Sequence, residues 1–348
     1  MMMRTIDFRF RVIRDGGEFC LLHPADGMPN IRMNDKTEIS TDFSGSFLIP
    51  EKNVNWLTDE IRPEMILNGV THPLGIFLPA TVSENDDGIT RSIQIEAYDR
   101  SWLARDCRAE SRLFFAAGTN YLSAVESVLT AAGIVQIVET ATAETLAEDR
   151  EDWDVGTSYL EIANQLLDEI NYEHIWFDKD GSCVLEPVSM PSAANIEHTL
   201  DENLIESMIT PGKKQTTDFY SAPNVFICIC SNADKGSAMT ATAENTNPQS
   251  PLSIARRGRR IAKVVQVKNI ASQQELQLYA ERLVADSMLT GETVTVQTAL
   301  LPGYGVGDTV ALQYGDVFSV CRERAWTMQL GVGGKMTHTL EKVVYNFD

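Results

Sequence analysis

The side chains best suited to acid–base or metal chemistry are scattered through the sequence. The five histidines are His23, His72, His174, His198 and His338. None forms an HExxH or HxH pattern, which would bring two imidazoles to one metal ion. Isolated histidines of this kind are more often surface residues or structural residues with satisfied hydrogen bonds. The sequence therefore predicts no metal centre and no histidine-based catalytic site, and it contains no GxSxG elbow or papain-like cysteine context.

Adjacent carboxylates occur at Asp86-Asp87 and in the run DREDWD, from Asp149 to Asp154. A calcium loop needs a spacing such as DxDxDG, which lets several oxygens converge on one ion. That spacing is absent from both runs. Sugar hydrolysis needs two carboxyl groups set across a cleft. We interpret both runs as solvated charged surface.

The glycine-rich segment Gly303–Asp308 (GYGVGD) has some likeness to a phosphate-binding loop. A dinucleotide fingerprint needs G-x-G-x-x-G after a strand and before a helix. Here the spacing is G-x-G-x-G, Pro302 precedes it, and a strand-like run from Thr309 to Gln313 follows. The segment predicts a tight connection between strands, and we expect no cofactor.

The six cysteines give no disulfide framework and no CxxC pair. They are Cys20, Cys107, Cys183, Cys228, Cys230 and Cys321. Cys228 and Cys230 lie two apart in a strand-like run, so both should point to one face of the strand. We expect reduced cysteines that pack in the core as small apolar residues.

One basic cluster stands out, Arg256, Arg257, Arg259 and Arg260 (RRGRR). Six basic residues and no acid lie between Arg256 and Lys268, whereas residues 141–210 hold 17 acids against Arg150 and Lys179, a balance of −15. Three interpretations stay open: phosphate binding, contact with the acidic 141–210 surface of a neighbouring copy, or a plain solvated loop. The net charge of −20 argues against sequence-specific nucleic-acid binding.

The sequence divides into three regions, which must position the residues described above. Residues 1–100 contain short β-type runs separated by turn residues, and predict a first β-barrel domain. The turns are Asp15-Gly16-Gly17, Asn68-Gly69 and Asp87-Gly88. Asn68-Gly69 between apolar stretches predicts a hairpin.

Residues 101–200 predict a small α/β module inserted between barrels. Apolar residues repeat with helical period from Asn120 to Ala132, and Gly133 follows. A second helix is predicted from Ser158 to Ile170, with a capping box formed by Ser158 and Glu161. A hairpin turning at Asp178-Lys179-Asp180-Gly181 follows this helix.

Residues 201–348 predict a second β-rich barrel domain with one helix at 272–289, and part of 201–265 is expected to complete the first barrel. Between the strand-like runs at Val225–Ile229 and Val264 lies a polar segment that we expect to form no core. The predicted fold is thus mainly β with an α+β insertion: two related β-barrel domains and one α/β module.

The length of 348 residues agrees with two or three domains. No apolar run approaches the ~20 residues that span a bilayer, and the start (MMMRTIDFRFRV) lacks the apolar block of a signal peptide. We therefore expect synthesis in the cytoplasm of the producing cell and no membrane insertion by this chain.

Several segments together resemble the baseplate hub or tail-tip proteins of long-tailed bacteriophages, relatives of the late control gene D family and of the hub part of type VI secretion spikes. The segments are Asn55–Pro79, Glu96–Arg108, Val155–Pro187, Pro223–Ile261 and Ala280–Leu312.

The resemblance implies a non-enzymatic ring, usually a homotrimer, that joins the tail tube to the spike or tip and lets DNA pass. It implies a place in the virion tail after assembly in the cytoplasm of the bacterial host. Because the sequence ends at Asp348 without a lysozyme, peptidase or spike domain, wall degradation is expected of another polypeptide.

Two other classes of function remain. A carbohydrate-binding or adhesion module would use tryptophans for stacking on sugars, with Trp56, Trp102, Trp153, Trp176 and Trp326 as candidates. A hydrolase would need a site that the sequence does not reveal.

Overall fold

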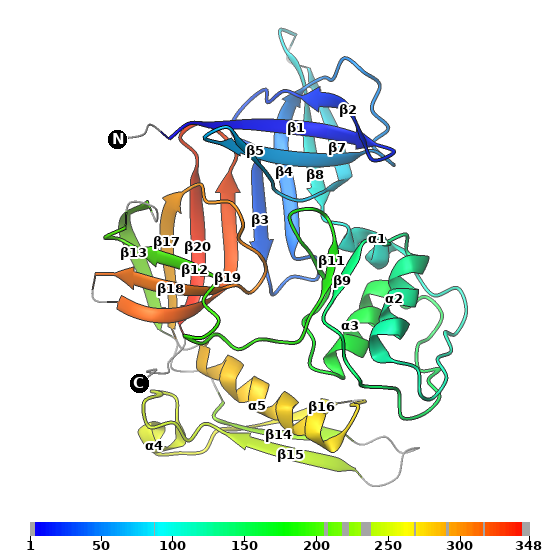
Figure 1. The fold of residues 1–348 in the computed structure, drawn as a ribbon, viewed down its shortest axis with the longest axis vertical. Coiled ribbons are helices and arrows are strands. Elements are labelled where there is room, and N and C mark those ends of the chain that lie inside the picture. Colours follow the sequence, from blue (N-terminus) through cyan, green and yellow to red (C-terminus); the bar gives the residue numbers. More distant parts are fainter. Residues whose placement is uncertain are drawn as a thin grey trace.

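Strands outweigh helices in the chain as a whole, and the fold is mainly β with an α/β insertion, as predicted (Figure 1). The computed structural model describes residues 4–86, 88–204, 208–217, 223–230, 238–267, 269–289, 292–315 and 317–342. Asp87 of the predicted third turn and Lys268 of the basic region lie outside these ranges. Among the described helices, none is long and apolar enough to cross a membrane.

Two tight hairpins build the first sheet, whose strand order is β2-β1-β5-β6. The strands are β1 (Ile6–Arg14), β2 (Gly17–Leu22), β5 (Glu60–Leu67) and β6 (Val70–Pro73). The turns are Asp15-Gly16 and Asn68-Gly69, with φ of 52° and 75° in the first and 51° and 82° in the second. Positive φ at both positions is what a type I′ turn requires, so the predicted Asn68-Gly69 hairpin is confirmed.

A larger sheet runs across the middle of the molecule (Figure 1) in the order β13-β17-β20-β19-β3-β4-β8-β7, with β18 and β12 attached beside β19. Its strands from residues 1–100 are β3 (Asn30–Asn34), β4 (Thr41–Leu48), β7 (Leu78–Asp86) and β8 (Arg91–Tyr98). Its strands from the second half are β12 (His198–Asp201), β13 (Ile209–Thr217), β17 (Glu292–Ala299), β18 (Thr309–Tyr314), β19 (Val317–Gln329) and β20 (Lys335–Lys342).

The long strand β19 joins the two β regions. Its first part, Val317–Arg322, pairs with β18, and its last part, Ala325–Gln329, pairs with β3. Its register against β20 shifts between Glu323 and Ala325. At the same point, its partner on the other side changes from β18 to β3. A bulge bends a strand and increases its twist, which allows β19 to belong to both regions.

Backbone hydrogen bonds also connect the first sheet with the larger one. Just beyond β2, the amide of Ala25 donates to the carbonyl of Ser46 in β4 at 2.9 Å. Ile61 of β5 and Phe77, directly before β7, exchange both backbone hydrogen bonds at 2.8 Å. Strands β1, β2, β4, β8, β7 and β5 are therefore linked in a closed circuit of pairings.

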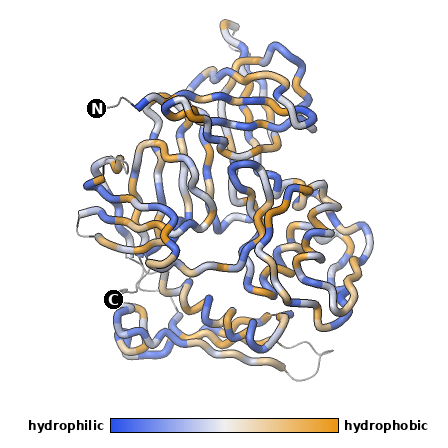
Figure 2. The backbone as a smooth tube through the Cα atoms, in the orientation of Figure 1, coloured by the Kyte–Doolittle hydropathy of each residue, from blue (hydrophilic) through white to orange (hydrophobic). Residues whose placement is uncertain are grey.

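Aromatic rings fill the space inside this circuit. Phe10, Phe43, Phe47 and Phe77 are all buried. The ring centroids of Phe10 and Phe47 are 5.3 Å apart in an edge-on arrangement, and those of Phe43 and Phe77 are 5.6 Å apart. Figure 2 shows hydrophobic and hydrophilic residues alternating along many of these strands. The alternation places one face of each strand in the core and the other outside.

The α/β module packs two main helices against a small sheet. Its elements are α1 (Ser101–Asp106), α2 (Tyr121–Ala131), β9 (Ile137–Glu139), α3 (Tyr159–Asp168), β10 (Trp176–Phe177) and β11 (Cys183–Leu185). The side chain of Asn120 accepts from the amides of Leu122 and Ser123, and Ser158 accepts from Glu161. Both predicted helices and the predicted hairpin between β10 and β11 are confirmed.

The expectation that the polar segment between Ile229 and Val264 forms no core is wrong for its described residues. They include β15 (Met239–Glu244) and α4 (Ile254–Arg257), which lie between the strands β14 (Val225–Cys230) and β16 (Ala262–Val267). The three strands form a separate sheet, and α5 (Gln273–Leu289) covers one face of it. Ala241 and Ala243 alternate with threonines in β15, and these small residues fit beneath the helix. The predicted helix 272–289 is confirmed.

The same pairings contradict the expectation that part of 201–265 completes the first barrel. Strands β12 and β13 pair with β18 and β17 of the second β region, and β14, β15 and β16 pair with one another. The alternation of Phe226, Cys228 and Cys230 toward α5 explains why β14 joins its own small core. Residues 201–265 thus contribute to two other parts of the molecule.

Candidate functional site

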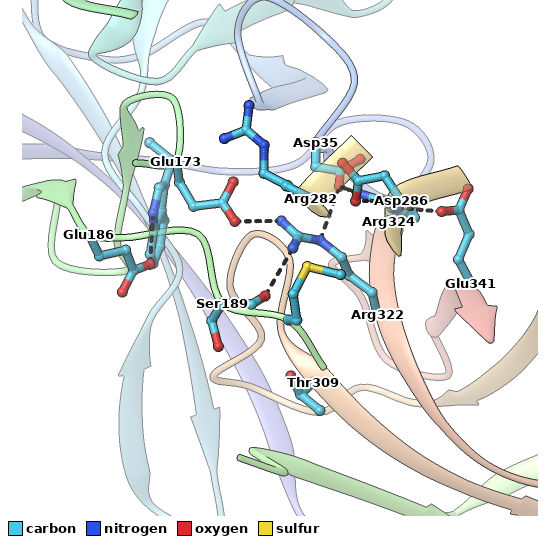
Figure 3. Close-up of polar contacts among 12 residues, drawn as sticks. Asp35, Glu173, Glu186, Ser189, Arg282, Asp286, Thr309, Arg322, Arg324 and Glu341 are labelled. Carbon is cyan, nitrogen blue, oxygen red and sulfur yellow. Dashed lines mark hydrogen bonds and ion pairs between the residues drawn. The ribbon is translucent and has the colours of Figure 1, made fainter. Parts of the chain in front are cut away.

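Arg322 on β19 lies at the centre of a charged cluster where the units meet (Figure 3). Its Nη2 donates to Glu173 Oε1 at 2.7 Å, and its Nη1 donates to the carbonyl of Ser189 at 3.3 Å. Its Nε lies 3.7 Å from Oδ2 of Asp35, on the turn after β3. Since Glu173 and Ser189 belong to the α/β module, one guanidinium links the module to both β regions.

Arg324, two residues later, links the first β region to β20 and α5. Its Nη1 donates to Asp35 Oδ2 at 2.7 Å, its Nε donates to Glu341 at 2.5 Å, and its Nη2 lies 3.6 Å from Asp286 of α5. Burial alone would lower the pKa of Arg324, but Asp35 and Glu341 outweigh it and raise that pKa. The guanidinium therefore stays charged within a mostly buried cluster.

Glu323 points away from the two arginines into the second β core. Its carboxylate lies 2.7 Å from Nδ1 of His338, and Nε2 of that ring lies 3.1 Å from the hydroxyl of Thr298. Glu323 and His338 are both fully buried. Burial raises the pKa of Glu323. The pair gives one isolated histidine the satisfied structural role that the sequence predicted.

The glycine-rich segment 303–308 is a connection between β17 and β18 that packs against this cluster. Gly307 has φ 73°, and a Cβ there would lie 2.7 Å from Nη2 of Arg322. The Gly305 amide donates to Asp308 at 2.6 Å, which closes the loop. The prediction of a tight connection between strands is confirmed, and close approach to Arg322 is the reason for glycine at 307.

A cavity of about 360 Å³ lies beside this loop, between the first β region, the β10–β11 hairpin and the second β region. Aromatic side chains form much of its wall, including Phe77, Trp176 and Trp326. The His198 ring stacks on Tyr304 with centroids 3.8 Å apart, and its Nε2 lies 2.9 Å from Asp308. No sequence motif indicates this stack, because His198 lies about a hundred positions from Tyr304 and Asp308.

Metal and thiol chemistry find little support in the described part of the chain. No group of three or more His, Cys, Asp or Glu side chains there could hold a metal ion. Burial raises the pKa of Cys321 to about 12. The same effect raises that of Cys183, so neither is a ready thiolate nucleophile.

The five tryptophans are buried or half-buried, which does not suit stacking on sugars. Trp153 and Trp326 belong to cores, and Trp102 stacks on Tyr98 with centroids 5.0 Å apart. Trp176 donates to Glu186 at 3.2 Å. These contacts assign the rings structural roles.

The predicted basic cluster lies far from the Arg322–Arg324 cluster, at α4 and the turn after it (Figure 1). Arg260 makes two hydrogen bonds to Glu244, at 2.8 and 2.5 Å. Arg256 donates from Nε to the carbonyl of Pro248 at 2.9 Å, and Arg259 is exposed. Arg257 is half-buried. The structure thus brings the four arginines together on one loop.

The interpretation of the DREDWD carboxylates as solvated surface is confirmed, since all four are exposed, but the other two residues of the run are not at the surface. Arg150 and Trp153 are buried, and Arg150 makes two hydrogen bonds to Glu169, at 2.8 and 2.9 Å. Glu169 also accepts from the hydroxyl of Tyr121 at 2.8 Å. Glu151 and Asp154 are exposed, as predicted. The buried residues anchor this loop to the module core, a role that a run of charges does not reveal.

Comparison with known proteins gives a match in structure. No family model matches the sequence, and no curated protein sequence does. The tail protein from Neisseria meningitidis MC58 superposes with a TM-score of 0.68 at 14% identity, covering 96% of each chain. The 43 kDa tail protein of prophage MuSo2 from Shewanella oneidensis gives 0.67 at 9% identity, covering 98% of this chain and 99% of that one. The chain has the fold of prophage tail proteins.

This tail-protein fold extends to secretion machinery. The E. coli c3393 protein, a component of the type VI secretion system, superposes with a TM-score of 0.54 at 11% identity. The match covers 97% of this chain and 78% of that one. The resemblance inferred from the sequence is confirmed at the level of the fold. In this chain, the Arg322–Arg324 cluster contacts both β regions and the α/β module.

Proposed function

We propose that the chain is a structural hub of a phage, prophage or tail-like particle, located in the virion tail after assembly in the host cytoplasm. In this role it forms a ring, joins the tail tube to the tip or spike, and lets DNA pass. The protein acts by assembly rather than catalysis and inserts in no membrane. The observation that carries the proposal is a tail-protein fold whose central sheet, in the described part of the chain, ends in the edge strands β7 and β13.

The central sheet contains one strand arrangement twice. In chain order, the first set is β3, β4, β7 and β8, and the second is β13, β17, β19 and β20. Across the sheet, both sets have the same spatial order: the first strand of the set, then the second, the fourth and the third. These orders are β3-β4-β8-β7 and β13-β17-β20-β19. The two sets meet where β19 pairs with β3. This repetition supports two related domains, and the closed circuit around Phe10 and Phe43 supports a barrel in the first.

The same repetition identifies the surfaces for ring formation. Among the described strands, the two ends of the sheet are β7, the third strand of the first set, and β13, the first strand of the second set. The Ile61–Phe77 bridge closes the first circuit only at the start of β7, and the described residues place no strand beside Thr81–Asp86 on that side. The internal junction has the same kind of pairing, because β19 is the third strand of its set and β3 is the first strand of its own. If β13 of one copy pairs with β7 of the next, that junction is repeated between copies. A head-to-tail contact of this kind closes into a ring, and three copies would place six sets around it.

Charges on the two edges are complementary. Lys214 on β13 is exposed, and β7 carries exposed Glu84 and Asp86. Within one copy these edges lie at opposite ends of the sheet path and on opposite sides of the molecule (Figure 1), so they are not paired with each other. An exposed edge strand is a template for another strand, and opposite charges favour one register and direction of pairing.

The outer face of the sheet is rich in hydroxyl and amide side chains. Core residues such as Ile31 and Phe43 alternate with this outer set. Half-buried or exposed members are Ser44, Ser46, Gln94, Thr295, Gln297, Thr327, Thr337 and Thr339. We propose that this face lines the channel. A surface with few free cations lacks the phosphate contacts that bind DNA, so DNA would slide along it.

Zero-length cross-linking with a carbodiimide tests the β13–β7 contact in assembled material. A mixture of copies with light and heavy nitrogen isotopes identifies links between copies. The proposal expects mixed-isotope links from Lys214 to Glu84 or Asp86, and their loss in Lys214→Gln. A ring that forms without such links would overturn the proposed contact, and a chain that stays monomeric within purified tails would overturn the hub assignment.

A further inference from the structure

The loop between β15 and β16, residues 245–261, is held by buried polar side chains and is called the arginine loop below. Asn224, directly before β14, is fully buried. Its Nδ2 donates to the carbonyls of Leu252 and Arg259 at 3.3 and 3.0 Å, and its Oδ1 accepts from the amide of Ile261 at 2.7 Å. One side chain thus fixes both ends of the basic segment.

Three more buried side chains stabilise the arginine loop from within. Asn245 donates from Nδ2 to the hydroxyl of Ser250 at 2.9 Å, and Ser253 accepts from the amide of Arg256 at 3.3 Å as the cap of α4. Asn245, Ser250 and Ser253 are at most 1% exposed. Fully satisfied buried networks hold one conformation. A solvated loop needs no such support, whereas a binding loop gains affinity from it.

The arginine loop presents positive charge on a strongly acidic protein. Arg256, Arg259 and the nearby Lys263 are exposed. Arg260 forms an ion pair with Glu244. The adjoining strand β16 is an edge of its sheet and exposes Val264 to 55%. This surface fits an anionic protein partner with some apolar area.

The α/β module offers a matching surface in the loop before α3 and in the first turn of that helix. Glu151, Asp154 and Glu161 are exposed there and are called the acidic face. Asp154 lies 3.6 Å from Arg112, so part of its charge is used within the module. Glu161 also lies in the first turn of α3. The acidic face therefore has the opposite charge to the arginine loop.

We infer that the arginine loop binds the acidic face of the α/β module of a neighbouring copy; this rests on the proposed ring. In Figure 1, β13 and α4 lie on the left, whereas β7, α2 and α3 lie on the right. A neighbour whose β7 meets this copy's β13 brings its module to the side that carries the arginine loop. The second contact is thus continuous with the first and is made head to tail as well.

Exposed charge pairs are individually weak, and salt screens them. Their combined effect here is to favour the correct neighbour and to slow dissociation of the ring. The inference therefore predicts that ring stability falls as salt rises. It also predicts that charge reversal on either surface weakens the ring and that reversal on both restores it.

The experiment compares three full-length variants with the wild type by mass photometry at low and high salt. Arg256→Glu with Arg259→Glu, and Glu151→Lys with Glu161→Lys, are each expected to raise the dissociation constant of the ring about tenfold or more at low salt. The four substitutions together are expected to recover most of that loss. Arg9→Glu is a matched charge control that should change little, because Arg9 is an exposed residue of β1.

The outcomes separate the two proposals. If rings form and the Lys214 cross-links persist, but both reversals leave dissociation unchanged or the combined variant shows no recovery, the arginine-loop contact is wrong and the hub proposal stands. If neither rings nor cross-links form in the wild type, both proposals fail. Circular dichroism of each variant confirms that weakened assembly does not reflect unfolding.

Discussion

Arg324 on β19 and Asp35 on the turn after β3 form an ion pair of 2.7 Å between residues 289 positions apart. Their side chains are 12% and 6% exposed. The pair sits where β19 changes its partner from β18 to β3. This ion pair therefore stabilises the junction between the two β regions. Arg322 adds an ion pair to Glu173 of the α/β module.

Replacement of Arg324 by methionine should destabilise the fold strongly. The change leaves Asp35 and Glu341 buried without their main cationic partner. Breaking a buried pair in this way costs about 3–5 kcal/mol of unfolding free energy. Urea denaturation measures the change. Arg32→Met is the matched control, because Arg32 is 60% exposed in its pair with Asp42 and should cost at most about 1 kcal/mol. Equal losses would contradict a special role for the junction.

The acid side of the stability profile should depend on Glu341. Burial alone would raise the pKa of Glu341, but Arg324 and Lys36 outweigh it and hold this pKa below the ordinary 4.5. A carboxyl with a lowered folded-state pKa contributes stability above its unfolded pKa, and loses that contribution as pH falls through the folded value. Glu341→Gln should therefore be less stable than the wild type near neutral pH, and the difference should shrink below about pH 4.5.

Unfolding titrations at a series of pH values measure this difference. Glu84→Gln is the control, since Glu84 is 66% exposed in its pair with Arg91. A difference between wild type and Glu341→Gln that stays constant down to acidic pH would show that the carboxylate charge is not what stabilises the junction.

Thiol labelling should separate the cysteines into two groups. Cys183, Cys228, Cys230 and Cys321 are buried, whereas Cys20 and Cys107 are half-buried. Burial also raises the pKa of the Cys228 and Cys230 thiols. A maleimide added to the native protein should modify only Cys20 and Cys107 on the time scale of minutes, and all six after denaturation. Rapid native labelling of Cys228 or Cys230, read by peptide mass, would contradict the packing of β14 under α5.

Positive charge on the outer sheet face should slow DNA release from particles. Thr295 and Thr339 are cross-strand partners on β17 and β20. In the proposed ring, lysines at these two positions would line the channel and bind phosphate. Particles with Thr295→Lys and Thr339→Lys should release DNA more slowly than the wild type, most clearly at low salt. Glu110→Gln, at an exposed acid of the module outside the proposed contacts, should leave release unchanged, and the reverse pattern would move the channel lining to the module.

Local features of the fold were predictable because they follow from neighbouring residues. Asn68-Gly69 fixes a two-residue turn, and Asn120 and Ser158 cap helices through their own side chains. The long-range features were not. The pairing of β19 with β3 joins residues about 295 apart, and β15 reads weakly as a strand because its buried residues are alanines.

The candidate site shows the same division. The four arginines of RRGRR were visible as a charge cluster, but the buried Asn224 that fixes their loop lies over 30 residues earlier. Arg322 and Arg324 carried one signal, because with Glu323 they form a run of three charges within a strand. Their partners come from four distant segments, and only the folded chain brings those together.

Cryo-electron microscopy of an assembled tail or hub tests the account most directly. The account predicts a closed ring in which β13 of each copy runs beside β7 of the next, so that the central sheets join around the channel. A ring held together through other surfaces, with both of these edges left open to solvent, would contradict it.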